Sequence, residues 1–130
     1  MKKFFVLSCA VAFGIFLSNH AMESSESTKL GLVIFRMQDA QLVRAASQGN
    51  AGLAKIFIQL PAVNVNFKDG QGRTALHYAA EKGLTDLAEE LIRRDANTDI
   101  RDNAGETPRQ LAERNHHQAI VALLSEPKAR

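Results

Sequence analysis

The stretch DGQGRTALHYAAEKG, residues 69–83, is partly repeated by DNAGETPRQLAERNH, residues 102–116. The recurring residues are of turn-forming or small types and keep one step of 33 positions: Asp69 and Asp102, Gly72 and Gly105, Thr74 and Thr107, Ala79 and Ala112. A fixed step of this length is typical of repeat proteins, in which each unit is one small supersecondary structure. The 33-residue repeat therefore restricts the chain to folds made of stacked units.

The middle unit predicts a turn, a helix, a second turn and a second helix. Asp69 begins a glycine-rich turn, Thr74 is suited to cap a short helix over residues 75–81, and Gly83 is suited to close it. A second helix is expected over residues 86–94, where apolar side chains recur at helical spacing. The next unit has a clearer start, because Thr107-Pro108 and Gln110 make a capping box with proline at the first helical position.

A weaker copy precedes these two, since Ala45-Ala46 stands 34 positions before Ala79-Ala80. Three units follow, at about residues 37–68, 69–101 and 102–126. A single helix pair of this size cannot bury its own apolar face, so we expect each unit to cover its neighbour.

Residues 69–83 closely resemble the ankyrin repeat pattern D-x-x-G-x-T-P-L-H-x-A-A-x-x-G, with Ala75 where that pattern has Pro. Residues 42–50 resemble an N-terminal capping repeat of that family, and the polar last unit resembles a C-terminal one. The resemblance covers residues 38–124. It implies an all-α ankyrin repeat solenoid of about three helix-turn-helix repeats with hairpin-like loops.

The family pattern usually has Gly where the second helix turns into the hairpin, whereas this chain has Asp95 and, one unit earlier, Ala62. Asp tolerates left-handed backbone, but Ala adopts it at a cost of roughly 1 kcal/mol. We therefore expect the first hairpin to take a different turn.

The N-terminal segment has the layout of a secretory signal peptide. Lys2 and Lys3 precede an uncharged apolar run, residues 4–17, which is too short to span a bilayer. We expect a signal peptide at 1–21, a polar linker at 22–29 and an apolar capping segment at 30–37, ahead of a repeat domain at 38–126 and a tail at 127–130. A lipid anchor at Cys9 and an uncleaved membrane anchor are the alternatives.

The full chain has 16 Lys and Arg and 14 Asp and Glu, and the charged residues within 1–21 are Lys2 and Lys3. Removal of the signal therefore leaves 14 basic and 14 acidic residues. A near-neutral chain gives no argument for nucleic acid. Cys9, the single cysteine, would leave with the signal, so we expect neither a disulfide nor a thiol nucleophile. No small-molecule substrate is indicated, and contact with a membrane is expected only through an uncleaved signal segment.

Thr74, His77 and Glu81 could suggest chemistry, but their places in the repeat favour a scaffold. His77 falls at the third helical position and is expected to bond the turn and Thr74, which is the role the resemblance implies. His116-His117 is expected to be a solvated turn, because neighbouring residues point apart and do not chelate together. No cysteine, histidine and carboxylate set has ligand spacing. We therefore expect no catalytic residues, no metal and no cofactor, and the chain is interpreted as not an enzyme.

Ankyrin repeats mostly bind other proteins through hairpin tips and the exposed side of the first helices. Carried over to this chain, the resemblance implies the following partner-binding residues: Lys68, Gly70, Gln71, Arg73, Glu81, Lys82, Arg101, Asn103, Ala104, Glu106, Arg114 and Asn115. Gln71, Arg73, Glu81 and Lys82 are expected to face outward.

The sequence thus predicts a non-catalytic protein-interaction module, an exported adaptor or inhibitor, periplasmic or secreted and bacterial by the form of its signal. A secreted host-directed effector is the alternative. An enzyme with an unrecognised site and a membrane-anchored scaffold are further alternatives.

Overall fold

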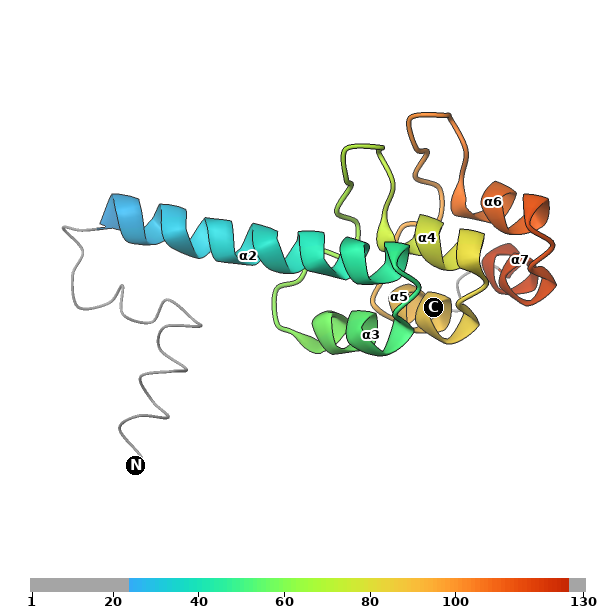
Figure 1. Ribbon diagram of the computed structural model, residues 1–130, viewed down its shortest axis with the longest axis horizontal. Coiled ribbons are helices and arrows are strands. Elements are labelled where there is room, and N and C mark those ends of the chain that lie inside the picture. The colour runs from blue at the N-terminus through green and yellow to red at the C-terminus, as the bar shows by residue number, and fades with distance from the viewer. Residues whose placement is uncertain (1–23, 127–130) are drawn as a thin grey trace, which may run out of the picture. The chain divides into compact units, whose positions relative to one another are not determined.

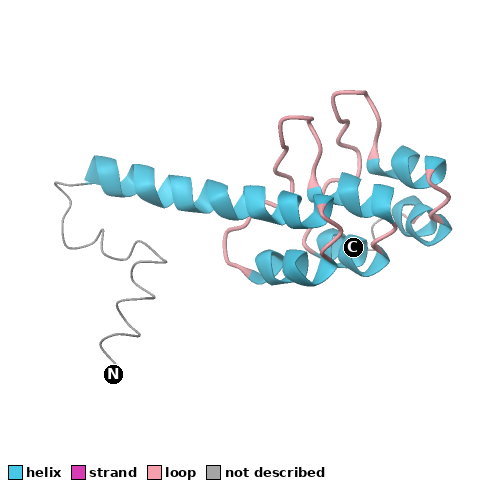
Figure 2. Cartoon of the chain, viewed as in Figure 1, coloured by secondary structure: helices cyan, strands magenta, loops and turns pink. Residues whose placement is uncertain are grey.

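The computed structural model describes residues 24–126, and within them the chain forms helices joined by turns, without a strand (Figures 1 and 2). The expected signal peptide and the tail at 127–130 lie outside the described residues. The described chain divides into two units, residues 24–37 and residues 38–126. None of its helices is long and apolar enough to cross a membrane.

Helix α2, Ser24–Ser47, is longer than the sequence pattern indicated. We expected a linker at 22–29 and a separate capping segment at 30–37, but residues 24–37 all lie in this one helix. The reason is that no proline interrupts residues 24–47 and Gly31 alone costs only about 1 kcal/mol. Three apolar side chains of the expected capping segment, Leu30, Val33 and Met37, are exposed in the helix.

The second unit is built from helix pairs, as the repeat predicts. The remaining helices are α3 (Ala51–Gln59), α4 (Ala75–Lys82), α5 (Thr85–Arg93), α6 (Pro108–Arg114) and α7 (Gln118–Ser125). In Figure 1, α4 and α6 lie side by side in one layer, and α3, α5 and α7 form a second layer beneath them. The all-α repeat fold is confirmed.

Small and branched side chains of every helix pair fill one continuous core. Ala79, Ala80 and Ala112 allow the first helices to approach closely, and leucines such as Leu76 and Leu111 fill the space between the layers. Each repeat packs its apolar side chains against those of the neighbouring repeat. Stacking therefore buries the apolar face that one helix pair cannot bury alone.

Two long loops connect the layers, and we call them the first finger, residues 61–74, and the second finger, residues 95–107; each begins after the cap residue of the preceding helix, Leu60 or Arg94. Figure 1 shows that both project to the same side of the helices. The first finger takes a different turn, as expected, because the cap residue Leu60 before it is extended, with φ −67° and ψ 139°, whereas Arg94 before the second finger has φ −91° and ψ 22°. Both turns contain one left-handed residue, Ala62 and Asp95, each with a φ of 62°. Helices α3 and α4 on either side are packed into the core through residues such as Ile58 and Leu76, so Ala62 accepts the left-handed conformation despite its cost.

Candidate functional site

The recurring aspartate of each finger organises the tip. The Oδ1 atom of Asp69 accepts the backbone N–H groups of Gln71 at 2.9 Å and Arg73 at 3.0 Å. One repeat later, Oδ1 of Asp102 accepts the N–H groups two and four residues ahead, both at 2.9 Å. The two fingers therefore end in the same turn, with the carboxylate bound to the loop backbone.

The tips of the two fingers are bonded to each other. The backbone N–H of Asn103 donates to the carbonyl of Gln71 at 3.0 Å, and its side-chain amide donates to the carbonyl of Gly70 at 3.1 Å. Lys68 Nζ lies 3.5 Å from the carbonyl oxygen of Arg101. Because the backbone itself forms part of this link, the fingers make one continuous surface.

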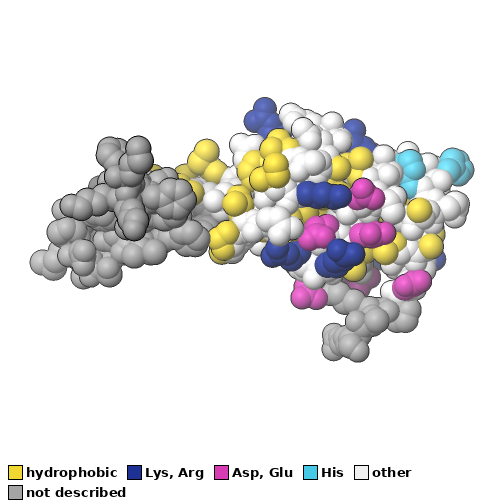
Figure 3. Space-filling model, turned by 90° about the horizontal axis from the view of Figure 1, so that it is seen from below, with side chains coloured by type: hydrophobic (Ala, Val, Ile, Leu, Met, Phe, Trp, Pro, Cys, Tyr) yellow, Lys and Arg dark blue, Asp and Glu magenta, His cyan; other side chains and the backbone are white. Residues whose placement is uncertain are grey.

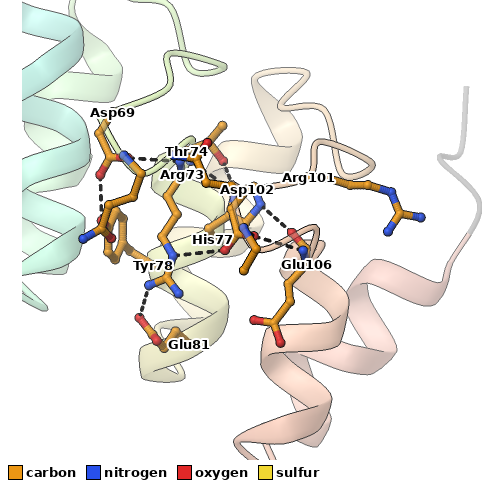
Figure 4. A network of polar contacts seen from close by, with 12 residues as sticks. Asp69, Arg73, Thr74, His77, Tyr78, Glu81, Arg101, Asp102 and Glu106 are labelled. Atoms are coloured by element: carbon orange, nitrogen blue, oxygen red, sulfur yellow. Dashed lines mark hydrogen bonds and ion pairs between the residues drawn. The ribbon is translucent and has the colours of Figure 1, made fainter.

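His77 joins the first helix of its own repeat to the next repeat. Its Nδ1 accepts the N–H of Thr74 at 3.1 Å, and its Nε2 lies 3.2 Å from the carbonyl of Glu106 (Figure 4). A neutral imidazole with its proton on Nε2 satisfies both bonds. Burial lowers the pKa of His77 because the charged form loses its hydration, and this outweighs the carbonyl of Glu106, which favours the charged form. The ring is therefore a structural link, as the sequence predicted.

Arg73 is the centre of a polar network between the second and third repeats. Its guanidinium bonds Glu81 at 2.9 Å and Asp102 at 3.2 Å, and lies 5.4 Å from the ring centre of Tyr78. Burial of Asp102 disfavours its charge, but the N–H of Glu106 and the guanidinium together hold the pKa of Asp102 below its usual value.

Tyr78 completes the network from the α4 side. Its hydroxyl donates to Oδ2 of Asp69 at 2.6 Å and lies 3.2 Å from Oε1 of Gln71. Burial and the bond to Asp69 raise the pKa of Tyr78 to about 12, so the phenol stays protonated at neutral pH. It serves as a hydrogen-bond donor to the finger.

The ion pair of the second repeat recurs in the third with its charges exchanged. Glu106 stands where Arg73 does, Arg114 stands where Glu81 does, and their side chains meet at 2.6 Å. Both pairs connect the end of a finger to the last turn of the helix that follows. The 33-residue spacing between equivalent positions can be read from the sequence. The contact within each ion pair, between residues eight positions apart, is visible only in the structure.

The predicted partner-binding residues divide into two groups. Nine are exposed on the fingers and at the helix ends: Lys68, Gly70, Gln71, Lys82, Arg101, Asn103, Ala104, Arg114 and Asn115. Arg73, Glu81 and Glu106 are half-buried, and the side chain of Arg73 is only 18% exposed. Arg73 does not face outward as expected, because it is held by carboxylates of two repeats.

Our interpretation of His116-His117 as a solvated turn holds for His116 only. His117 lies against Gly83, where an added Cβ would come within 2.7 Å of the ring. Its Nε2 lies 3.1 Å from the carbonyl of Glu81, so this ring also links the last two repeats. Within residues 24–126, no three histidine, cysteine, aspartate or glutamate side chains are grouped closely enough to hold a metal ion.

The opposite face carries a second set of cross-repeat contacts. Lys55 pairs with Asp86 at 3.5 Å, and Gln59 bonds both Glu90 and Arg94. Figure 3 shows this face, where basic and acidic side chains lie next to one another. Exposed pairs of this kind contribute about 0–1 kcal/mol each, so they add little to the core.

A family model of three ankyrin repeats matches residues 42–130. The chain is also similar to cyclin-dependent kinase inhibitor 2A of Monodelphis domestica, with 36% identity over 85 residues, which cover 65% of this chain and 49% of that protein. An ankyrin repeat protein of Acanthamoeba polyphaga mimivirus is 38% identical over 66 residues, 50% of this chain and 9% of that protein. A potassium channel of Oryza sativa is 41% identical over 66 residues, 51% of this chain and 7% of that protein.

The chain thus spans at most about half the length of these curated relatives. Ankyrin repeats are protein–protein interaction modules that are typically non-catalytic. The capping boxes, the paired fingers and the family match agree, and this chain belongs to the ankyrin repeat family.

Proposed function

We propose that this protein is a non-catalytic, exported adaptor or inhibitor that holds a partner protein across its fingers and the exposed side of its first helices. The observation that carries the proposal is the link between Asn103 and the carbonyls of Gln71 and Gly70, which holds the two fingertips in one fixed arrangement. A surface fixed before binding loses little conformational freedom when the partner arrives, so more of the contact energy becomes affinity.

An inhibitory role is supported by one relative. The Monodelphis domestica protein is by its name an inhibitor of a cyclin-dependent kinase, and it matches 65% of this chain. Inhibition by binding needs no catalytic groups, because a bound protein can block a surface of its target. For this chain we propose inhibition by binding and leave the target open.

Export is supported by the N-terminal sequence, in which Lys2 and Lys3 precede an apolar run. We propose a periplasmic or secreted protein. N-terminal sequencing of the protein from its own source tests this: a start at or near Met22 supports export, and a start at Met1 in the cytoplasm would contradict it.

The interaction surface is tested with two matched double variants. Lys82→Glu with Ala104→Glu changes the proposed surface. Arg94→Glu with Ala122→Glu is the matched control, because it also replaces one basic residue and one alanine by glutamate, at the end of α5 and in α7. All four positions are exposed, so neither variant removes a core contact. Each protein is immobilised, and proteins from the native source that it retains are identified by mass spectrometry.

The proposal predicts a protein that is retained by the wild type and by the Arg94/Ala122 variant and is lost with the Lys82/Ala104 variant. Retention by all three proteins would contradict the proposed surface. Circular dichroism on each variant must show unchanged helicity, so that a lost partner is not a lost fold.

A further inference from the structure

Four acidic side chains at the finger turns and beside them are bonded within the chain: Asp69, Glu81, Asp102 and Glu106. Glu81 and Glu106 each bond an arginine, at 2.9 and 2.6 Å. Asp102 accepts two backbone N–H groups on one oxygen and a guanidinium on the other. Both oxygens of Asp69 are likewise bonded, one to the backbone and one to the hydroxyl of Tyr78. These carboxylates present little free negative charge to a partner.

Two cations on the same fingers have no carboxylate partner among the described residues. Lys68 and Arg101 occupy equivalent positions, 33 residues apart, directly before the turn aspartates. Both are exposed, and neither forms an ion pair with any carboxylate in residues 24–126. In Figure 4, Arg101 points away from the polar network that holds Arg73.

Backbone carbonyls hold these two cations in place without neutralising them. Lys68 Nζ lies 3.5 Å from the carbonyl oxygen of Arg101, and Nη1 of Arg101 donates to the carbonyl of Gly105 at 2.8 Å. The side chains are therefore positioned before binding, and each keeps its full charge. Arg101 retains further N–H donors, which suit a carboxylate because the guanidinium can bind it in a bidentate manner.

We propose that the fingertip pair, Lys68 and Arg101, binds a run of aspartate and glutamate side chains in an acidic segment of the partner protein. This inference rests on the proposed function, in which the fingers hold a partner, and it names the chemistry of that partner. Lys82, also exposed and without a carboxylate in the described part of the chain, lies at the end of α4 and extends the positive charge of this side.

The charge pattern favours an acidic protein over nucleic acid. Nucleic-acid binding draws its affinity from many phosphate contacts, about six to ten in a typical case, and needs a continuous basic surface. Here the basic positions are few, and the exposed carboxylate of Asp99 lies on the second finger as well. A short acidic segment can meet Lys68 and Arg101 and avoid Asp99, whereas a phosphate backbone has negative charge along its whole length.

The test measures fluorescence anisotropy of a labelled hexaglutamate peptide titrated with the purified protein at low ionic strength. Lys68→Glu with Arg101→Glu should weaken binding by about tenfold or more, since close charge pairs govern such contacts. The matched control is Arg44→Glu with Arg94→Glu, two exposed arginines that also lack a carboxylate within residues 24–126. It makes the same change in net charge and should alter affinity by less than about twofold.

A milder variant, Lys68→Gln with Arg101→Gln, keeps the test valid if charge reversal disturbs the fingers, and it should give an intermediate loss. Equal weakening by the fingertip and control variants would overturn the proposal, as would no measurable binding of hexaglutamate to the wild type. Binding of single-stranded oligothymidylate as tight as that of hexaglutamate, with the same sensitivity to Lys68 and Arg101, would overturn the choice of partner class.

The two proposals fail separately. A partner protein captured through the Lys82/Ala104 surface, combined with no hexaglutamate binding, would remove the acidic segment and leave the proposed function standing. Hexaglutamate binding at the fingertips, combined with a captured partner that ignores the Lys82/Ala104 changes, would remove the proposed surface instead.

Discussion

His77 and Gln110 occupy the same position in the second and third repeats, and each completes the capping box of its first helix. His77 also reaches the carbonyl of Glu106 in the next repeat, whereas Gln110 bonds only Thr107 among the described residues. The local function of this position is thus common to both repeats. The contact between repeats is additional, and it forms only where another repeat follows.

The ion pairs differ in the same manner. Arg73 bonds Glu81 within its repeat and also Asp102 in the next, and its side chain is 18% exposed. Among the described residues the side chain of Arg114 bonds only Glu106, and it is 54% exposed. Equivalent ion pairs, with their charges exchanged, therefore differ in energetic weight according to whether a following repeat covers them.

The largest difference between the repeats is expected at the finger glycines. Gly72 and Gly105 both have left-handed backbone, with φ of 73° and 81°. A Cβ at Gly72 would lie 2.5 Å from Oδ1 and 3.0 Å from the backbone nitrogen of Asn103, whereas one at Gly105 meets nothing within 4 Å. Gly105→Ala should cost about 1 kcal/mol for its backbone conformation. Gly72→Ala should cost about 3 kcal/mol, because the fingers must also separate.

Chemical denaturation of both variants measures these free energies of unfolding. Equal losses for Gly72→Ala and Gly105→Ala would show that the fingers do not constrain each other. The bond between Asn103 and Gln71 would then contribute nothing to the stack.

A smaller difference is expected in the pH dependence of stability. Burial lowers the pKa of His77, so the unfolded chain takes up its proton more readily than the folded one. The contribution of His77 is complete above its unfolded pKa of about 6.5 and declines as the pH falls below that value. Asp102 acts in a separate window, because its lowered pKa adds stability that is lost only as the pH falls below about 3.8.

His77→Gln should therefore flatten the stability profile between about pH 7 and 5, while costing less than about 1 kcal/mol at pH 7. Glutamine is the matched replacement because Gln110 already forms the same capping box. Unfolding curves of the wild type and the variant at several pH values test this, and parallel profiles would contradict a neutral, buried His77.

Local features of the repeats were predictable from the sequence. The helix expected at 75–81 is Ala75–Lys82, the one expected at 86–94 is Thr85–Arg93, and Gly83 has the left-handed conformation assigned to it. These features depend on residues close together in the chain, such as a capping threonine or a closing glycine. A pattern recurring every 33 residues then fixes how the units stack.

Contacts that need the stacked geometry were not predictable. Arginine is usually a surface residue, so the sequence gives no sign that Arg73 is half-buried. Arg73 is covered because the next repeat brings Asp102 into contact with it. The length of α2 was missed for a different reason, because a polar start such as residues 24–29 does not by itself end a helix. The exposed fingertip residues stay a prediction, since their role depends on a partner.

A double-mutant cycle on Arg73 and Asp102 tests the central claim most directly, namely that internal repeats are joined by side chains that terminal repeats use only locally. Arg73→Gln, Asp102→Asn and the combined variant are compared by their free energies of unfolding. Asparagine preserves the turn, because its side-chain oxygen can still accept the backbone N–H groups. The account predicts a coupling energy of about 1–2 kcal/mol for this pair, and additivity within about 0.5 kcal/mol when Arg114→Gln replaces Arg73→Gln. Additive effects for Arg73 and Asp102 would contradict it.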